Sequence, residues 1–189
     1  MSIHPMELLK QKVSSVIVND QTSLVNEKND VLSRFYPILL YRFLEKPELV
    51  DKLREKLTPA IFDLLEENER VKNALLLRLA AGKVSVAEVE ITLNRAIPKS
   101  LAVLSNEAGN DAMAIIYYLR DHKASIYSLL PSWTTEVLAQ LNETYIKEQL
   151  LDIIPALPIA PEEKKQNKIF PLFTVLFGFS LIFLYHLSK

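Results

Sequence analysis

The sequence contains no cysteine and only three glycines, and these shortages exclude several kinds of functional site. Without cysteine the chain forms no disulfide and offers no thiolate to a metal ion, which is typical of a reducing compartment. The glycines, Gly82, Gly109 and Gly178, stand alone and far apart. A glycine-rich loop that would cradle a phosphate or a dinucleotide is therefore excluded.

Histidine is also scarce, and no group of residues has the spacing of a catalytic or metal-binding site. His4, His122 and His186 lack the short helical spacing that zinc-binding histidines share. His122 and Asp121 could serve as the base of a hydrolase, but no nucleophile motif accompanies them. A histidine that interacts with the dipole at a helix C-terminus is the commoner case. We therefore expect no catalytic, cofactor-binding or metal-binding residue, and no enzymatic activity.

Acidic residues are missing from the C-terminal end of the chain. Residues 164–189 hold four lysines and no acidic residue, out of 22 basic and 23 acidic residues in the whole chain. Residues 1–163 therefore contain 18 basic and 23 acidic residues, a net charge of about −5. A phosphate backbone repels a domain of this charge, so we exclude nucleic acid as a partner. We interpret the neighbouring carboxylates Glu66, Glu67 and Glu69 as solvent-exposed.

The chain has one long run without charge, from Ile169 to Leu187. As an α-helix this run would span roughly 28 Å, close to the ~30 Å hydrocarbon core of a bilayer. Lysines precede it, and the positive-inside rule then keeps the N-terminal side in the cytoplasm. Since the first residues also lack a signal peptide, we predict a single-pass protein of the bacterial inner membrane, with its N-terminal domain cytoplasmic and the lipid bilayer contacted through Ile169 to Leu187. A buried core helix is the alternative interpretation of the run.

The residues before this run have the periodicity of helices. Apolar residues recur every three or four positions, as at Leu49, Val50, Leu53 and Leu57, and no stretch alternates as a β-strand does. Ser85, with a glutamate three residues later, predicts a capping box and hence a helix start. We predict three regions: a helical domain over residues 1–153, a linker rich in proline and lysine over 154–168, and a transmembrane helix over 169–187.

Two segments of the helical domain resemble each other. The segment "VLSRFYPILLYRFL" aligns with "TLNRAIPKSLAVLS", which pairs Arg34 with Arg95 and Pro37 with Pro98. Further on, "PAIFDLL" aligns with "ASIYSLL", and the offset between the segments grows from 61 to 65 residues, which implies an insertion of four residues near "SNEAGND". We predict two divergent repeats and one more helix, over residues 5–67, 69–133 and 134–153.

The paired prolines and arginines each have two interpretations. Pro37 and Pro98 either bend long helices to suit the core, which is the commoner case, or kink them to shape a groove. Arg34 and Arg95 either bind a ligand or, more commonly, lie in solvent or hold helices together. Trp133 has the chemistry of a partner-binding anchor, but a place in the core is commoner.

The second repeat contains a serine-capped helix, a Leu/Ile-Pro-x-x-Leu step, a shorter helix and a "DH…S(I/L)xxLL" end. The residues that carry this pattern are Ser85, Pro98, Leu101, Asp121, His122, Ser125, Leu129 and Leu130. The pattern resembles the bacterial domain-of-unknown-function family 937 over residues 69–133, and more weakly over residues 5–67, although Lys99 and Ser100 replace an apolar pair. The resemblance implies an all-helical bacterial module without an established activity. Some similar chains place this module before a membrane helix and an outer-membrane-protein-A-like domain, which would bind peptidoglycan.

The expected fold is all-α, a helical bundle of two divergent helical repeats plus a C-terminal transmembrane helix. The expected function is that of a membrane-anchored helical interaction or scaffold module that faces the cytoplasm. It would bind a protein partner of unknown identity in a groove between the repeats. Two alternatives remain open. One is a tail-anchored eukaryotic helical adaptor of organelle membranes, and the other is the hydrolase that uses His122 and Asp121.

Overall fold

The computed structural model of the protein describes residues 3–19 and 24–141. Within those two stretches every regular element is a helix, so the predicted all-α fold is confirmed there. The predicted linker, the predicted transmembrane helix and residues 142–153 of the last predicted helix lie outside the described residues. Among the residues that are described, no helix combines the length and the apolar character needed to cross a bilayer.

The helices follow one another with short connections. In chain order they are α1 (Pro5–Leu9), the π-helical turn η1 (Lys10–Ser14), α2 (Ser15–Asn19), α3 (Val25–Glu45), α4 (Glu48–Glu55), α5 (Ile61–Leu64), α6 (Glu69–Ala80), α7 (Val86–Ala108), α8 (Ala112–Asp121) and α9 (Lys123–Ser128). A further helical stretch covers residues 134–141. The first three elements form one continuous N-terminal run.

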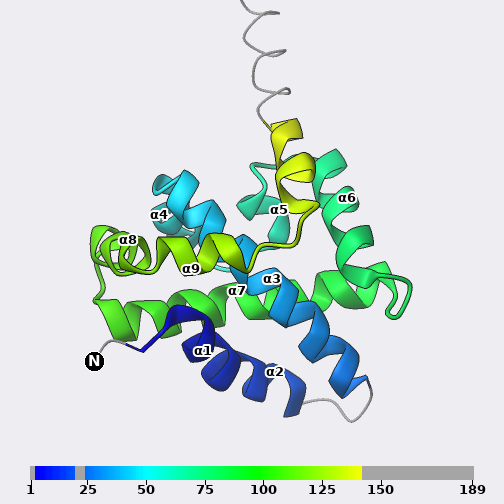
Figure 1. Cartoon of the computed structure of the whole chain (residues 1–189), viewed down its shortest axis with the longest axis horizontal. Helices are drawn as coiled ribbons and strands as arrows, with labels where there is room; N and C mark the ends of the chain where they lie inside the picture. The colour runs from blue at the N-terminus through cyan, green and yellow to red at the C-terminus, as the bar shows by residue number, and fades with distance from the viewer. Residues whose placement is uncertain (1–2, 20–23, 142–189) are drawn as a thin grey trace, which may run out of the picture. The chain divides into compact units, whose positions relative to one another are not determined.

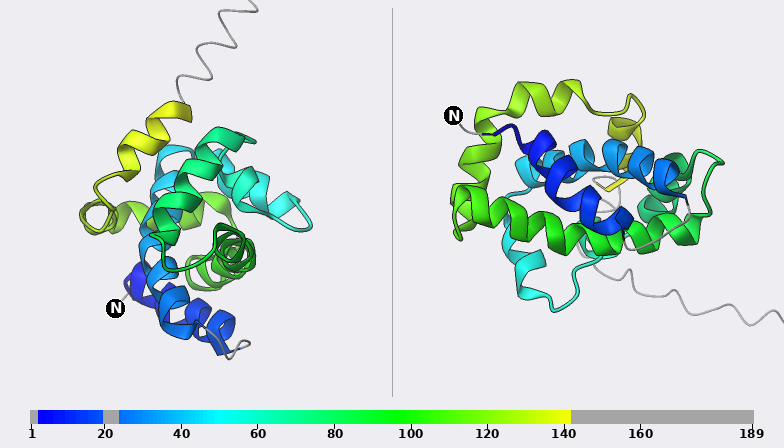
Figure 2. Two further views of the ribbon diagram at one scale, coloured as in Figure 1. Left: turned by 90° about the vertical axis from the view of Figure 1, so that its right-hand side faces the viewer. Right: turned by 90° about the horizontal axis from the view of Figure 1, so that it is seen from below.

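The long helices α3 and α7 form the centre of the described domain (Figure 1). The N-terminal run lies against both of them on one side, while α4, α5 and α6 lie on the opposite side, and Figure 2 shows the same layers from two more directions. Helices α8 and α9 pack along α3. The core therefore runs between these layers, and its largest fully buried side chains, Tyr36, Phe35 and Phe43, all come from α3.

Polar contacts tie the helices that meet at α3. The hydroxyl oxygens of Ser14 and Tyr36 lie 2.9 Å apart in a buried hydrogen bond between η1 and α3. Burial raises the pKa of Tyr36 to about 12, against a smaller opposite effect of the hydrogen bond from Ser14. The phenol therefore stays neutral at physiological pH, and its hydrogen bond satisfies both buried hydroxyls.

Helix α7 begins at the predicted position but not with the full predicted capping box. The Ser85 hydroxyl accepts a hydrogen bond from the Glu88 N–H at 3.2 Å, as an N-cap does. The Glu88 carboxylate instead binds the buried ammonium group of Lys28, 2.6 Å away, and this ion pair joins α7 to the start of α3. A buried charge needs such a partner, because desolvation without one is costly.

The two prolines lie at matching places in the two central helices. Pro37 is the twelfth residue after Val25, the first residue of α3, and Pro98 is the twelfth after Val86, the first of α7. The prediction that both prolines lie inside equivalent helices is confirmed. The next helices follow the same order, α4 and α5 after α3, and α8 and α9 after α7. Whether the two halves superpose throughout stays a prediction.

The acidic cluster after α5 is not uniformly exposed. The prediction of solvent exposure holds for Glu67 and Glu69 and is wrong for Glu66, which is half-buried. Arg42, which is 5% exposed, donates a hydrogen bond of 2.5 Å to Glu66, and Lys46 binds the other oxygen of the same carboxylate. Burial alone would raise the pKa of Glu66, but the hydrogen bonds from Lys46 and Arg42 outweigh burial and lower it.

Candidate interaction groove

A groove lies between residues 53–60 of the first predicted repeat and residues 94–105 of the second. It consists of two hollows, of about 440 Å³ and about 250 Å³, that share Leu57, Pro59 and Pro98. The remaining lining residues are Leu53, Arg54, Lys56, Thr58, Ala60, Asn94, Arg95, Lys99, Leu101, Ala102 and Ser105. We call this feature the Leu57 groove. Described residues from both predicted repeats therefore line this groove, and the binding of a partner between the repeats stays a prediction.

Leu57 projects from the connection between α4 and α5. The helical periodicity predicts that Leu57 continues the apolar face of a helix, and this prediction is wrong: α4 ends at Glu55, and Leu57 is 98% exposed. Helix α4 ends before Leu57 because Pro59 follows two residues later, and a proline disfavours helical backbone at the residue before it. The proline was therefore the signal in the sequence that Leu57 lies outside the helix.

The connection is fixed to α7 at its far end. The side-chain oxygen of Asn94 accepts a hydrogen bond of 2.8 Å from the Ile61 N–H, at the start of α5. The Asp63 carboxylate accepts another of 2.8 Å from the Ala60 N–H. These bonds occupy backbone groups that a helix start otherwise leaves unpaired. The wall of the groove that carries Leu57 is therefore held against the wall formed by α7.

Pro98 supplies the middle of the α7 wall. It is exposed and lines both hollows, whereas Pro37 at the matching place in α3 is buried. A proline inside a helix donates no hydrogen bond to the carbonyl four residues earlier, and its ring crowds that carbonyl. Pro98 thus deprives the Asn94 carbonyl of its helical partner. Of the two interpretations, a proline that shapes a groove fits Pro98, and a proline that serves the core fits Pro37.

The charged residues that line the groove are all basic. Arg54, Lys56, Arg95 and Lys99 take part, and no acidic residue does. Arg54 donates to the backbone oxygen of Asn110, and Lys56 binds Asp63, which together with its other carboxylate contacts raises the pKa of Lys56. The groove is therefore a basic site on a domain whose sequence is acidic.

A ring fills the matching place in the first repeat. The 61-residue offset pairs Tyr41 of α3 with Ala102 of α7. The Tyr41 ring packs edge to face against the ring of Tyr127 in α9, with centroids 5.1 Å apart, and Tyr127 donates a hydrogen bond of 2.7 Å to Glu45. Ala102 offers only a methyl group and lines the smaller hollow. The groove thus occupies the position that corresponds in the alignment to the contact between Tyr41 of the first predicted repeat and Tyr127 of the second.

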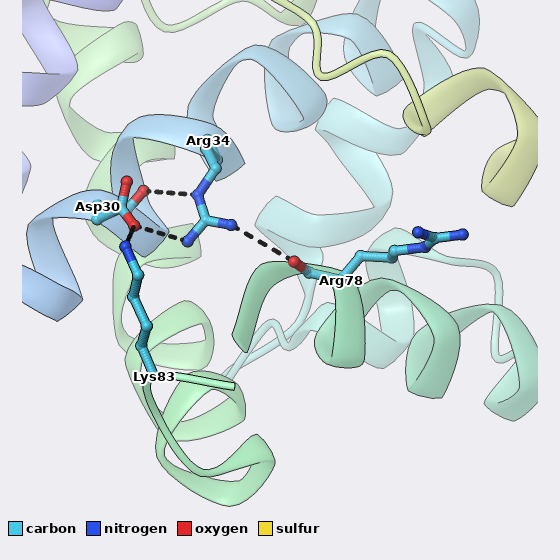
Figure 3. A network of polar contacts seen from close by, with 4 residues as sticks. All are labelled: Asp30, Arg34, Arg78 and Lys83. Carbon is cyan, nitrogen blue, oxygen red and sulfur yellow. Dashed lines mark hydrogen bonds and ion pairs between the residues drawn. The ribbon is translucent and has the colours of Figure 1, made fainter. Parts of the chain in front are cut away.

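The paired arginines lie in different surroundings. Figure 3 shows that Arg34 holds helices together: it donates to the Asp30 carboxylate at 2.9 Å and to the backbone oxygen of Arg78 at 3.4 Å, while Lys83 lies 3.7 Å from the same carboxylate. Because Arg78 belongs to the last turn of α6, its carbonyl lies at the negative end of that helix. The helix-pairing interpretation is confirmed for Arg34. Arg95 lines the Leu57 groove.

The residues of the hydrolase alternative lie at the ends of short helices. His122 ends α8, and its Nδ1 donates to the Tyr118 carbonyl at 3.0 Å, so a histidine at a helix C-terminus is confirmed. Ser125 lies 2.7 Å from Nε2 of His4. Nδ1 of His4 accepts a hydrogen bond of 3.2 Å from the Met6 N–H, so the neutral ring carries its proton on Nε2. His4 then donates this hydrogen bond to Ser125.

The other candidate residues have structural positions. Trp133 is half-buried and packs against the core, which confirms the commoner of its two interpretations. Over the stretches that the structure describes, no three histidine or acidic side chains are grouped closely enough to hold a metal ion.

Comparison with family models, with curated proteins and with solved structures finds no match to this chain. The resemblance of residues 69–133 to the bacterial domain family therefore stays a prediction. The interpretation of the groove rests on its own geometry and chemistry.

Proposed function

We propose that the chain is a membrane-anchored helical interaction module that faces the bacterial cytoplasm, binds a protein partner in the Leu57 groove and catalyses no reaction. The observation that carries this proposal is the groove itself. A single exposed leucine is ordinary on a protein surface. Leu57, however, projects between two hollows whose other shared walls are Pro59 and Pro98, with basic side chains around them. Apolar concave surface inside a polar rim is the anatomy of a protein interface.

The membrane anchor is supported by the sequence. The uncharged run from Ile169 to Leu187 has the length of a bilayer span, and Lys164, Lys165 and Lys168 precede it. Each of these lysines contributes on the order of 1 kcal/mol of attraction to an anionic leaflet. Residues 1–163, with a net charge of about −5, are repelled from the same surface. The helical domain then stands away from the lipid, with its groove accessible to a partner.

Fractionation and reporter fusions test the anchor. We expect the full chain to stay with the membrane pellet after an alkaline carbonate wash. Alkaline phosphatase fused after Lys189 should be active, and green fluorescent protein at the same place should be dark. A full chain that appears in the supernatant contradicts the anchor, and the reverse reporter result contradicts the orientation.

Photocrosslinking in living cells tests the groove. A photoreactive amino acid at Leu57 should give a discrete adduct with another protein. The control is the same amino acid at Lys12, which is also exposed but belongs to η1. An adduct from Leu57 alone supports the proposal. If neither position gives an adduct, or both give the same set, the Leu57 groove is not the interaction site.

A further inference from the structure

We infer that the Leu57 groove binds an acidic peptide segment of the partner protein and that one aromatic side chain of that segment occupies the hollow at Ala102. This inference rests on the proposed function, because it specifies the partner for the same groove. It is carried by three features of the described residues: the shape of the hollow, the apolar character of its walls and the sign of the charges around it.

The shape points to an aromatic side chain. In α3 the place that corresponds to Ala102 is filled by Tyr41, whose ring packs against Tyr127 with centroids 5.1 Å apart. Neither ring of this pair has a counterpart in the hollow beside α7. Ala102 replaces one, and Phe62, the counterpart of Tyr127 in the alignment, lies beneath the ammonium group of Lys72, 5.6 Å from its ring centroid. A ring from a partner would restore at Ala102 the ring packing that Tyr41 makes with Tyr127.

The walls suit such a ring. The hollow of about 250 Å³ is bounded by Leu53, Leu57, Pro59, Pro98 and Leu101 as well as by Ala102. These side chains offer apolar surface on which an aromatic ring can pack. The hollow is smaller than the ~300–1,000 Å³ pockets that enclose small molecules. One bulky side chain is therefore a better match than a cofactor.

The basic side chains of the groove favour a peptide in which acidic residues flank the aromatic residue. Arg54, Arg95 and Lys99 line the groove, and none of the lining residues is acidic. Carboxylates that flank the aromatic residue would meet the basic side chains of the groove. Complementary rim charges raise the association rate and discriminate against wrong partners. A lysine-rich segment would meet charges of its own sign.

An anionic membrane suits this surface less well. A flat bilayer cannot fill a concave hollow, and Leu57 offers it only one projecting apolar side chain. Glu55 and Glu67 are exposed close to the groove in the sequence, and they would be repelled by anionic lipid headgroups. A peptide side chain can enter the hollow between the basic residues without approaching these carboxylates.

Binding of synthetic peptides to the full chain in detergent micelles tests the inference. Three fluorescent probes are compared: a peptide with a central Trp flanked by glutamates, the same peptide with lysines in place of the glutamates, and the glutamate peptide with Ala in place of Trp. We expect the Trp–glutamate probe to bind at least about tenfold more tightly than either of the others. Equal binding of the lysine probe overturns the acidic preference, and equal binding of the alanine probe overturns the aromatic anchor.

Matched variants place the binding in the groove. Ala102→Tyr fills the hollow with the residue that stands at the corresponding place in α3, and Ala87→Tyr makes the same change at an exposed position elsewhere on α7. Lys99→Glu reverses a groove charge, and Lys12→Glu makes the same charge change in η1. We expect Ala102→Tyr and Lys99→Glu each to weaken the Trp–glutamate probe about tenfold, with a smaller loss for Lys99→Glu at high salt. Unchanged binding in both groove variants overturns the inference.

The outcomes separate this inference from the proposed function. If the Trp–glutamate probe does not bind while Leu57 gives a protein adduct in cells, the peptide chemistry is wrong and the interaction function stands. The same conclusion follows if the crosslinked segment of the partner is basic or lacks an aromatic residue. If Leu57 crosslinks only to lipid, or gives no adduct at all, both proposals are overturned.

Discussion

The central helices α3 and α7 have the same plan and different surroundings. Each carries a proline at the same distance from its first residue, yet Pro37 is buried and Pro98 is exposed. One turn further on, Tyr41 packs against a ring from α9, whereas Ala102 lines a hollow. At this place one long helix is therefore covered by a side chain of the domain, and the other lines a hollow.

The surroundings of Arg34 and Arg95 differ as well. Arg34 binds the end of α6 and is part of the structure that surrounds α3, while Arg95 lines the Leu57 groove beside α7. Tyr41 has a ring partner within the domain, whereas α7 carries Ala102 at the corresponding place, where the groove lies. Substitutions in the two halves test this difference.

The largest effect is expected in the core of α3. Phe35 is fully buried, and the corresponding residue of α7 is the buried Ala96. We predict that Phe35→Ala lowers the free energy of unfolding by about 3–5 kcal/mol, because it leaves a cavity that the first half cannot close. Denaturation of the full chain in micelles, followed by far-UV circular dichroism, measures this. A loss below about 1 kcal/mol would mean that the two halves are packed alike at this place.

The alignment pairs Arg42, the buried cation of an ion pair in the first half, with the apolar residue Val103. We predict that Glu66→Ala lowers the free energy of unfolding by about 3 kcal/mol, since Arg42 then keeps a buried charge without its carboxylate partner. The control Glu67→Ala, at an exposed neighbour, should change it by less than about 0.5 kcal/mol. Similar losses in both variants would contradict the role of Glu66.

The pH dependence of Glu66 gives the same test an independent readout. The pKa of Glu66 in the folded chain is below its ordinary value of 4.5, so the folded state favours the ionised carboxylate. The contribution of Glu66 to stability is then complete above pH 4.5 and is lost as the pH falls through the lower, folded pKa. The difference between wild type and Glu66→Ala should shrink over that range. A difference that stays constant on acidification would be evidence against this ion pair.

A smaller effect is expected where the two helices differ by a ring. Tyr41→Ala gives α3 the residue that α7 has, and we predict a loss of about 1–3 kcal/mol, because the contact with Tyr127 disappears. Ala102→Tyr makes the reverse exchange in α7 and should change the free energy of unfolding by less than about 0.5 kcal/mol, since the hollow has room for the ring. Equal losses in thermal unfolding would show that Ala102 is as tightly packed as Tyr41.

The smallest effect concerns the N-terminus of α1. Burial, and then the neighbouring His122, lower the pKa of His4 below 6.5, so its stabilising contribution is complete above pH 6.5 and is lost as the pH falls through the folded pKa. Asn is an equally good N-cap that does not titrate. We predict that His4→Asn changes stability at neutral pH by less than about 1 kcal/mol and removes part of its decline below pH 6.5. Thermal unfolding at two pH values checks this, and an unchanged decline would contradict it.

These comparisons also show what the sequence could and could not predict. The start of α7 at Ser85, the places of Pro37 and Pro98 in long helices and the helix end at His122 follow from short-range signals, and the structure has all of them. The position of Leu57 outside the helix was not predicted, because its spacing matched a helical face and this pattern outweighed the weaker signal of Pro59. Capping and turn signals act within a few residues, so they can be recognised from sequence alone.

The groove and the buried charges could not be predicted from the sequence. Glu66 lies next to other carboxylates in the sequence, but its environment is set by Arg42, which stands 24 residues earlier. Leu57 and Ala102 are brought together by the packing of α4 and α7. In the sequence, Pro98 and Arg95 are distinguished only by their alignment with Pro37 and Arg34. This alignment does not predict which of the two prolines is exposed. Tertiary packing decides this.

Photocrosslinking in living cells can compare the adduct from Leu57 in wild type, Ala102→Tyr and Ala87→Tyr. We propose that the absence of a ring at Ala102 opens the site where a partner binds. We predict that Ala102→Tyr abolishes the protein adduct while Ala87→Tyr, which adds the same side chain to the same helix, leaves it unchanged. An adduct of equal yield in wild type and both variants would contradict the claim.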